Sequence, residues 1–168
     1  QELKQLDAGS WFNEKFKGAQ IVTFQEAIDL VKTRAGLYPE TKAPEVYGRR
    51  GFDMEALLMA ALKKNGLDKP DSRTPLVIQS FSAESLRKLR DVQHSTLPHT
   101  FLINSDPKGE WLSPEGMKRI RGFADGIGPA KGLIDREPKL VEWAHQAGLT
   151  VTPYTFRATM PGKFKDVR

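Results

Sequence analysis

Apolar residues recur at helical spacing in five separate stretches of the chain. Thr23 and Glu26 have the spacing of a capping box, and the apolar stripe behind them predicts a helix over residues 24–34. Further helices are predicted over about residues 54–64, after Ser82, after Ser113-Pro114, and from about Asp135 to Gly148. The apolar residues of the helix after Ser82 are expected inside the protein: Leu86, Leu89 and Val92.

Two stretches show no regular period, and we expect loops there. Residues 1–20 hold Trp11, Phe12 and Phe16 among glycine, lysine and asparagine, which predicts a loop that packs its aromatics onto another part of the protein. Residues 43–51 are rich in proline, glycine and arginine, so a second loop is expected between the first predicted strand and the second helix.

Five β-strands are predicted between these helices. They are residues 37–42, 76–81, 99–103, 124–129 and 149–155. The stretch 76–81 is almost continuously apolar, which is typical of a strand buried on both faces. Because strands alternate with helices, the fold class is α/β, with a parallel sheet covered by helices.

A doubly wound sheet and a (β/α)₈ barrel both fit this order. No glycine-rich phosphate loop follows any strand, which weakens the doubly wound sheet. Polar residues stand at the strand ends instead, where a barrel builds its active site: Glu40, Lys42, Gln79, Asn104 and Tyr154. The barrel is therefore favoured, although the chain supplies five strands and a closed barrel needs eight.

Composition adds a few limits. The 168 residues suffice for one domain, over residues 1–168, and 39% hydrophobic with 28% charged residues is ordinary for a globular protein. The formal net charge of +5 is spread along the chain, which is weak support for an anionic ligand and gives no nucleic-acid signature. The absence of cysteine excludes disulfides and thiolate chemistry. No run approaches the ~20 apolar residues of a membrane span.

Glu40 and Lys42 are the first candidates for chemistry. They point the same way on a strand, about 7 Å apart along the chain. Glu40 is a candidate ligand for a hard cation such as Ca²⁺ or Mg²⁺, but such an ion needs further carboxylates. Lys42 is a candidate contact for a phosphoryl oxygen. A surface ion pair between the two side chains is the alternative interpretation.

The other strand ends offer weaker candidates. Gln79 needs a hydrogen-bond partner, which is either a ligand or a loop carbonyl. From position alone, Phe81 fits the core better than a ligand-binding wall. Tyr154 and Arg157 either line an anionic site or form an exposed pair. Asp125 is a catalytic candidate, but an aspartate before glycine more often fixes a turn.

Histidine offers no acid or base at a useful spacing. His94 lies in a predicted loop, His99 opens a strand, and His145 lies on a helix away from the strand ends. None has a partner at metal-binding or triad spacing, so each is interpreted as structural.

Four motifs in order resemble the glycerophosphodiester phosphodiesterases, the periplasmic bacterial type and its longer relatives in particular. They are Tyr38–Pro44, Val77–Phe81, Ala124–Pro129 and Pro153–Arg157, and the resemblance covers about residues 20–160. It implies a TIM (β/α)₈ barrel, of which this chain looks like the third to seventh βα units. It also implies metal-dependent hydrolysis of deacylated phospholipid diesters to glycerol 3-phosphate and an alcohol.

The resemblance also implies roles for single residues. Glu40 matches one of the family's acidic metal ligands, with Ca²⁺ or Mg²⁺ as the cation, and Lys42 matches a catalytic phosphate contact. Gln79, Phe81 and Tyr154 are then walls of the substrate pocket. A periplasmic or secreted location is implied, and a cytoplasmic one stays open.

The chain departs from the family pattern in several places. It has no His-Arg-Gly segment, no Glu-x-Asp ligand pair and no His-Asp dipeptide, so the family's catalytic histidines lie outside it. The family's last strand is also missing. We therefore expect either part of a complete enzyme or a catalytically inactive phosphoester-binding module. A phospholipase D-like barrel acting on intact lipids is a further alternative.

Overall fold

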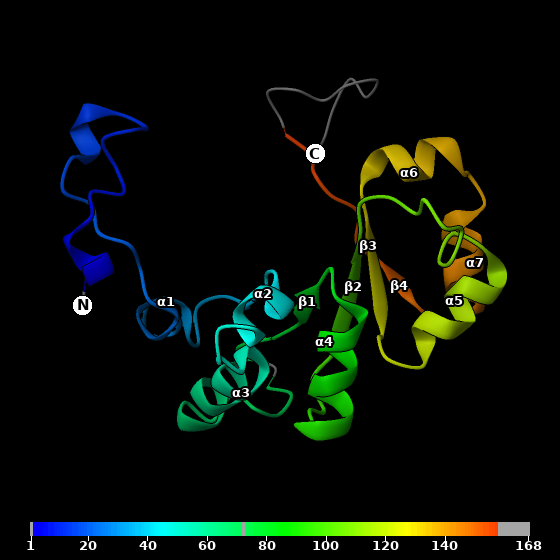
Figure 1. The fold of residues 1–168 in the computed structure, drawn as a ribbon, viewed down its shortest axis with the longest axis horizontal. Helices are drawn as coiled ribbons and strands as arrows, with labels where there is room; N and C mark the ends of the chain where they lie inside the picture. Colours follow the sequence, from blue (N-terminus) through cyan, green and yellow to red (C-terminus); the bar gives the residue numbers. More distant parts are fainter. Residues whose placement is uncertain (1, 72, 158–168) are drawn as a thin grey trace.

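The structure is a computed structural model, and it describes residues 2–71 and 73–157. Its centre is a parallel sheet whose strands follow the chain order: β1 (Ile78–Ser80), β2 (His99–Ile103), β3 (Gly126–Pro129) and β4 (Thr150–Val151). All three neighbouring pairs are parallel, so all carboxyl ends lie at the upper edge of the sheet in Figure 1. The predicted α/β class with a parallel sheet is confirmed.

The first predicted strand is present only as an irregular edge. Leu37 pairs with Leu76 and Glu40 pairs with Gln79 in isolated parallel bridges beside β1. Pro39 lies between them and has no N–H to donate, so a continuous ladder is not possible there. The described sheet therefore has four regular strands, and the stretch 37–41 occupies a fifth position beside them.

The five predicted helices are all present. They are α1 (Phe24–Val31), α3 (Met54–Lys64), α4 (Ala83–Arg87), α5 (Pro114–Arg121) and α7 (Leu140–Gln146). The Thr23–Glu26 capping box is formed, and Ser82 and Ser113 each accept a hydrogen bond from the third residue beyond. Gly66, at φ +66, follows α3 in a conformation that glycine adopts without strain.

Two short α-helices were not predicted, and neither were the 3₁₀ helices η1 (Glu2–Gln5) and η2 (Glu14–Phe16) in the expected N-terminal loop. α2 (Pro44–Gly48) occupies part of the expected loop, and Pro44 at its first turn is a signal for a helix start that composition concealed. α6 (Lys131–Arg136) precedes α7, so the predicted start near Asp135 is wrong. Pro138 explains the break, because the residue before a proline is disfavoured in helical conformation.

The helices cover one face of the sheet and form the core with it. Buried side chains of that face and of the helices pack in one cluster that includes Ile28, Leu62, Leu86, Ile127 and Leu140. Val92, by contrast, is 62% exposed, and its predicted burial is wrong. The chain continues α4 as a π-helical turn over Lys88–Val92, and the wider turn rotates Val92 away from the core.

The opposite face of the sheet is open at its β1 edge among the described residues, whereas every residue of β2 and β3 is buried. On β1, Ile78 and Ser80 are fully buried, whereas Gln79 is only half-buried and Phe81 is 47% exposed, so burial of this strand on both faces is wrong. On β3, a Cβ at Gly128 would meet Leu102 Cδ2 at 2.6 Å. Glycine there lets the side chains of β2 close over β3 from this face.

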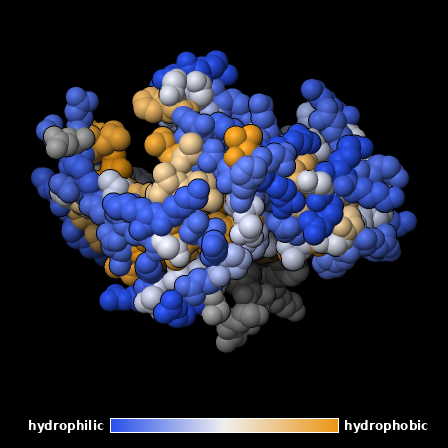
Figure 2. All heavy atoms as spheres, turned by 90° about the horizontal axis from the view of Figure 1, so that it is seen from below, coloured by the Kyte–Doolittle hydropathy of each residue, from blue (hydrophilic) through white to orange (hydrophobic). Residues whose placement is uncertain are grey.

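The N-terminal residues stand beside the sheet and its helices (Figure 1). Trp11 is 82% and Phe12 is 70% exposed, and both contact other rings of the same segment, Phe12 packing between Trp11 and Phe16. Their expected packing onto another part is therefore wrong for the described residues. Figure 2 shows a largely hydrophilic face whose hydrophobic atoms gather in its left half, the side of this segment.

Among the described residues, no helix has the length and apolar character needed to cross a bilayer.

Candidate functional site

A cavity of about 430 Å³ lies on the open face of the sheet, toward the carboxyl ends of its strands. Four of the five residues predicted for the site line it. Its lining consists of Tyr38, Glu40, Gln79, Phe81, Leu102, Thr152, Pro153, Tyr154 and Thr155. These residues come from the stretch 37–41, β1, β2 and the segment after β4, so the fold gathers positions more than 100 residues apart in sequence.

Glu40 supplies the negative charge of this cavity. Its backbone is fixed because Gln79 N–H donates to the Pro39 carbonyl at 2.9 Å and Thr41 N–H donates to the Gln79 carbonyl at 3.0 Å. Its Oε1 atom is buried and has no hydrogen-bond partner. A buried carboxylate oxygen without a donor loses the solvation of water and gains nothing in return, so it is available for a cation or a donor group.

Gln79 and Tyr38 form one wall of the cavity. Gln79 Nε2 donates to the Tyr38 backbone carbonyl at 3.2 Å, and Tyr38 Oη donates to Thr100 Oγ1 at 3.0 Å. Of the two partners expected for Gln79, the loop carbonyl is therefore present. The hydrogen bond holds the amide plane at the cavity wall.

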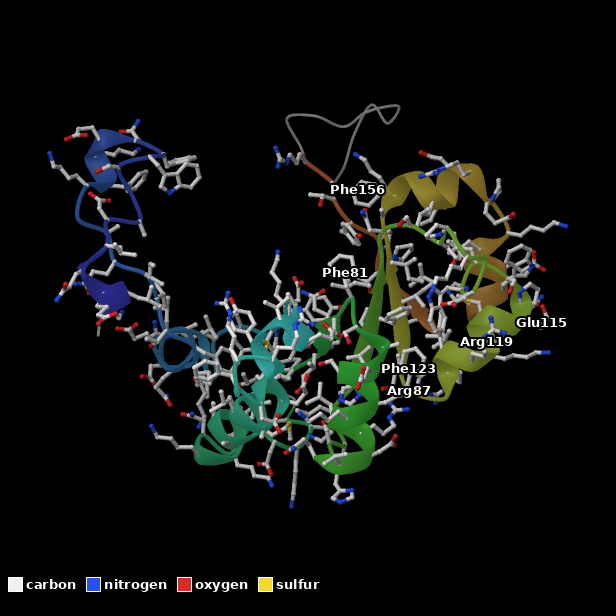
Figure 3. All side chains as sticks on the ribbon, in the orientation of Figure 1. Phe81, Arg87, Glu115, Arg119, Phe123 and Phe156 are labelled. Atoms are coloured by element: carbon white, nitrogen blue, oxygen red, sulfur yellow. The ribbon has the colours of Figure 1, made fainter. Side chains whose placement is uncertain are left out.

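Phe81 and Tyr154 close the cavity at the opposite wall. Their rings meet edge to face with centroids 6.0 Å apart, and Tyr154 Oη donates to the Ile103 carbonyl at 3.3 Å. Burial raises the pKa of Tyr154, and the negative charge of Glu40 raises it further, so the phenol keeps its proton as a donor. Phe81 and Phe156 lie at the same end of the sheet in Figure 3. The core interpretation of Phe81 is wrong, because its ring lines a cavity.

Lys42 and Arg157 are not brought into the lining. Lys42 lies two residues beyond Glu40 with an exposed side chain, and Arg157 is likewise exposed. The ion pairs formed within residues 2–71 and 73–157 do not include one between Glu40 and Lys42. The surface ion pair expected as the alternative is therefore not formed.

Asp125 belongs to the other end of the sheet. Its Oδ2 accepts from Arg90 Nη2 at 2.8 Å and from His99 N at 3.0 Å, and its Oδ1 accepts from Arg121 Nη1 at 2.9 Å. Both oxygens are thus occupied by protein donors, which suits a structural anchor. Figure 3 shows Arg87 and Phe123 on this side as well, where the guanidinium lies 4.5 Å from the ring centroid.

The histidines all lie away from the cavity lining. His99 is fully buried at the start of β2, with Nε2 3.2 Å from Ser95 Oγ. Burial, with the nearby positive charge of Arg90, lowers the pKa of His99 to about 4, so its imidazole is neutral at pH 7. His94 and His145 are exposed.

The cavity supplies one candidate metal ligand and not the complete ligand set of a metal site. Glu40 presents an unpartnered carboxylate oxygen, as a Ca²⁺ or Mg²⁺ ligand does. Yet no cluster of three or more His, Cys, Asp or Glu side chains that could hold a metal ion occurs among the described residues. The remaining ligands of such a site are not supplied by this part of the chain.

Sequence reasoning missed five cavity residues, and strand alternation identifies two of them. Tyr38 stands two residues before Glu40, and Thr152 stands two residues before Tyr154, so each shares a face with a predicted residue. Leu102 follows from the register that pairs it with Gly128 on the same face. Alternation around the predicted positions would have found Tyr38 and Thr152, whereas Leu102 depends on the register of the folded sheet.

Comparison with known proteins gives a consistent result. The model of the "Glycerophosphoryl diester phosphodiesterase family" matches residues 1–165. A glycerophosphodiester phosphodiesterase of Bacillus subtilis is 33% identical over 163 residues, covering 92% of this chain and 53% of that protein. One of Haemophilus influenzae is 28% identical over 188 residues, covering 88% and 51%. The solved structure of an Oleispira antarctica phosphodiesterase, in complex with the product sn-glycerol-3-phosphate, superposes with a TM-score of 0.73 at 22% identity, covering 95% of this chain and 60% of that one.

The fold is an α/β fold of the TIM-barrel class, defined by the parallel sheet, its outer helices and the cavity at the carboxyl ends. The four regular strands correspond to part of such a barrel. The chain belongs to the glycerophosphoryl diester phosphodiesterase family. It spans about half the length of the curated relatives it matches.

Proposed function

We propose that this chain forms part of the catalytic domain of an enzyme that hydrolyses glycerophosphodiesters to glycerol 3-phosphate and an alcohol. The observation that carries the proposal is the cavity that holds Glu40, Gln79, Phe81 and Tyr154 at the carboxyl ends of the strands. The family supports the substrate class, and a relative's structure with sn-glycerol-3-phosphate supports a cavity of this kind for a glycerophosphate.

Each cavity residue receives a role from its chemistry. Tyr154, whose pKa is raised, keeps its proton and donates to a substrate oxygen when it releases the Ile103 carbonyl. Phe81 offers an apolar wall for the carbon chain of glycerol, and the held amide of Gln79 offers an oxygen to its hydroxyl groups. Lys42, which lies outside the cavity lining, is proposed to contact the phosphate as a point charge and to lower the energy of the charge that develops there.

Glu40 is proposed as one ligand of a divalent cation, Ca²⁺ or Mg²⁺. Such an ion, when bound, neutralises the phosphodiester charge and orients it for attack. Within this chain, the contribution of Glu40 is a carboxylate oxygen that is buried, fixed in direction and not occupied by another donor.

A phosphoester-binding protein without hydrolase activity is the second candidate. The cavity lining contains Glu40, Tyr38 and Tyr154 as titratable groups but no histidine, and His99 lies at the other end of the sheet. If no acid–base pair joins the site from elsewhere, the cavity binds a glycerophosphate without cleaving it.

The test is a product assay on the protein at its full natural length. Glycerophosphocholine is supplied with Ca²⁺ or Mg²⁺, and released glycerol 3-phosphate is measured by enzyme-coupled detection. Intact phosphatidylcholine is supplied in parallel. Release of glycerol 3-phosphate from the first substrate supports the proposal. Binding of glycerol 3-phosphate in calorimetry without any release favours the second candidate, and release of choline from the intact lipid alone favours a phospholipase D-like enzyme.

A further inference from the structure

Thr41 stands between the two charged site residues and faces away from the cavity. Its side chain is turned into the helix layer, and the residue is only 2% exposed. All three of its polar groups are bonded: N–H donates to the Gln79 carbonyl at 3.0 Å, the carbonyl accepts from Ser80 Oγ at 2.9 Å, and Oγ1 lies 2.9 Å from Ser85 Oγ. Three bonds in different directions leave this backbone little freedom to rotate.

A charged group lies at the far end of this chain of bonds. Ser85 Oγ donates to Glu55 Oε1 at 2.5 Å, and Glu55 Oε2 pairs with Lys88 Nζ at 3.0 Å. Lys88 also pairs with Asp53 at 2.8 Å, the residue that caps α3. Glu55 is only 4% exposed, although it is charged. A buried charge is costly unless it is paired and hydrogen-bonded, and Glu55 is both.

The direction of the protons follows from these partners. A carboxylate only accepts hydrogen bonds, so Ser85 gives its single proton to Glu55. The oxygen of Ser85 is then left as the acceptor, and Thr41 Oγ1 must be the donor between the two hydroxyls. The direction of the Thr41 side chain is thus set by a carboxylate on α3.

Ser80 connects β1 to the same hydrogen-bond network as Thr41. It is fully buried on β1 between Gln79 and Phe81, both of which line the cavity. Because its hydroxyl donates to the Thr41 carbonyl, the buried face fixes how the Glu40 segment sits against β1. A network of this kind is rigid only when every member is satisfied.

We propose that Thr41, held through Ser85 by the Lys88-paired Glu55, is a positioning residue that sets the direction of Glu40 and Lys42. Thr41 touches neither substrate nor cation. It acts through Glu40, which precedes it in the chain, and Lys42, which follows it, because the backbone of Thr41 between them is held in place. This inference rests on the proposed function for its activity readout only.

The test compares Thr41→Val with Thr74→Val in the protein at its full natural length. Thr74 is a matched control, because it is 1% exposed and its Oγ1 accepts from Thr33 N at 2.8 Å, but it lies before β1 at the other end of the sheet. Each variant removes one hydroxyl hydrogen bond of a buried threonine, so both are expected to lose a similar amount of stability. Thr41→Val alone is expected to lower kcat for glycerophosphocholine roughly 10- to 100-fold, since a small misplacement of a reacting group has effects of that size.

Two further variants separate positioning from packing. Thr41→Ser keeps the hydroxyl and is expected to restore most of kcat, whereas Ser85→Ala is expected to lower kcat as Thr41→Val does. The double variant Thr41→Val/Ser85→Ala is expected to have a kcat no lower than that of either single variant, because both substitutions interrupt the same chain of hydrogen bonds. Equal kcat in Thr41→Val and Thr74→Val, or multiplying effects in the double variant, would overturn the proposal.

A measurement made without substrate distinguishes a failure of the positioning role of Thr41 from a failure of the proposed function. Hydrogen exchange of the Thr41 amide, measured by NMR, is expected to speed up at least about 10-fold in Ser85→Ala and not in Thr74→Val. If the wild-type protein releases no glycerol 3-phosphate but this exchange pattern holds, the proposed function fails and the positioning role stands. Unchanged exchange in Ser85→Ala removes the positioning role whatever the activity.

Discussion

Glu40 and Asp125 lie at opposite ends of the sheet, and the fold treats the two carboxylates in opposite ways. At the carboxyl ends, Glu40 keeps a buried oxygen without a partner beside an open cavity. At the amino ends, Asp125 has both oxygens occupied by Arg90, Arg121 and the His99 backbone. The same carboxylate chemistry is therefore left available at one end and neutralised at the other.

This difference distinguishes a carboxylate that serves function from one that serves the stability of the fold. An unpartnered buried carboxylate lowers the stability of the fold, and it is expected where a ligand completes it. A fully bonded carboxylate stabilises the fold and offers nothing to a ligand. Barrel proteins follow the same division, with chemistry at the carboxyl ends of the strands and stability at the amino ends.

The sharpest test of the comparison is Glu40→Gln. Loss of the charge is expected to lower kcat for glycerophosphocholine roughly 100- to 1,000-fold, as removal of a preorganised electrostatic group does. The same change is expected to raise the unfolding free energy by up to about 1 kcal/mol, because the charge on a carboxylate with one buried, unpartnered oxygen disappears. Coupled assay and urea unfolding measure the two effects. Unchanged activity in this variant would remove Glu40 from the site.

The second test uses the buried histidine at the amino ends. The pKa of His99 is lowered to about 4 against 6.5 for an ordinary histidine, so the unfolded chain takes up a proton over a range where the folded one does not. The stabilising contribution is complete above pH 6.5 and is lost as the pH falls toward 4. Between pH 7 and pH 5, the loss is expected to be about 2 kcal/mol.

Urea unfolding at the two pH values checks this expectation in His99→Gln, with exposed His94→Gln as the control. The control should keep the wild-type pH dependence, and His99→Gln should lose most of it. An equal pH dependence in all three proteins would mean that His99 does not carry the effect.

The smallest expected effect belongs to Asp125→Asn. Two arginine pairs are weakened, but their side chains are partly exposed, so the expected loss of unfolding free energy is only about 1.5 kcal/mol. The kcat of the folded protein is expected to stay within about twofold of wild type, because Asp125 lies at the opposite edge from the cavity. A fall in kcat as large as that of Glu40→Gln would show that the two ends are not separate in function.

Local sequence signals determined much of the fold. The capping box at Thr23 and the serine caps at Ser82 and Ser113 act over three residues, so they could be predicted without any tertiary contact. The predicted strand over residues 99–103 matches β2, and all five of its residues are buried. The family resemblance followed from ordered motifs and is confirmed over residues 1–165.

Other features depended on contacts that no short stretch encodes. Val92 has the helical spacing of a core residue, yet a π-helical turn rotates it outward. Phe81 is as apolar as any core residue, yet the described residues leave its face of the sheet open. Burial depends on which elements meet across a face, and periodicity cannot supply that.

The sequence by itself determined that Glu40, Gln79, Phe81 and Tyr154 stand at strand ends, because alternation and order are local properties of the chain. The tertiary structure alone decided what surrounds them. It left Glu40 without a partner, gave Asp125 three donors, and tied Thr41 to Glu55 through Ser85. The physical reason is that a charge is set free or neutralised by neighbours distant in sequence, and only the packed fold selects those neighbours.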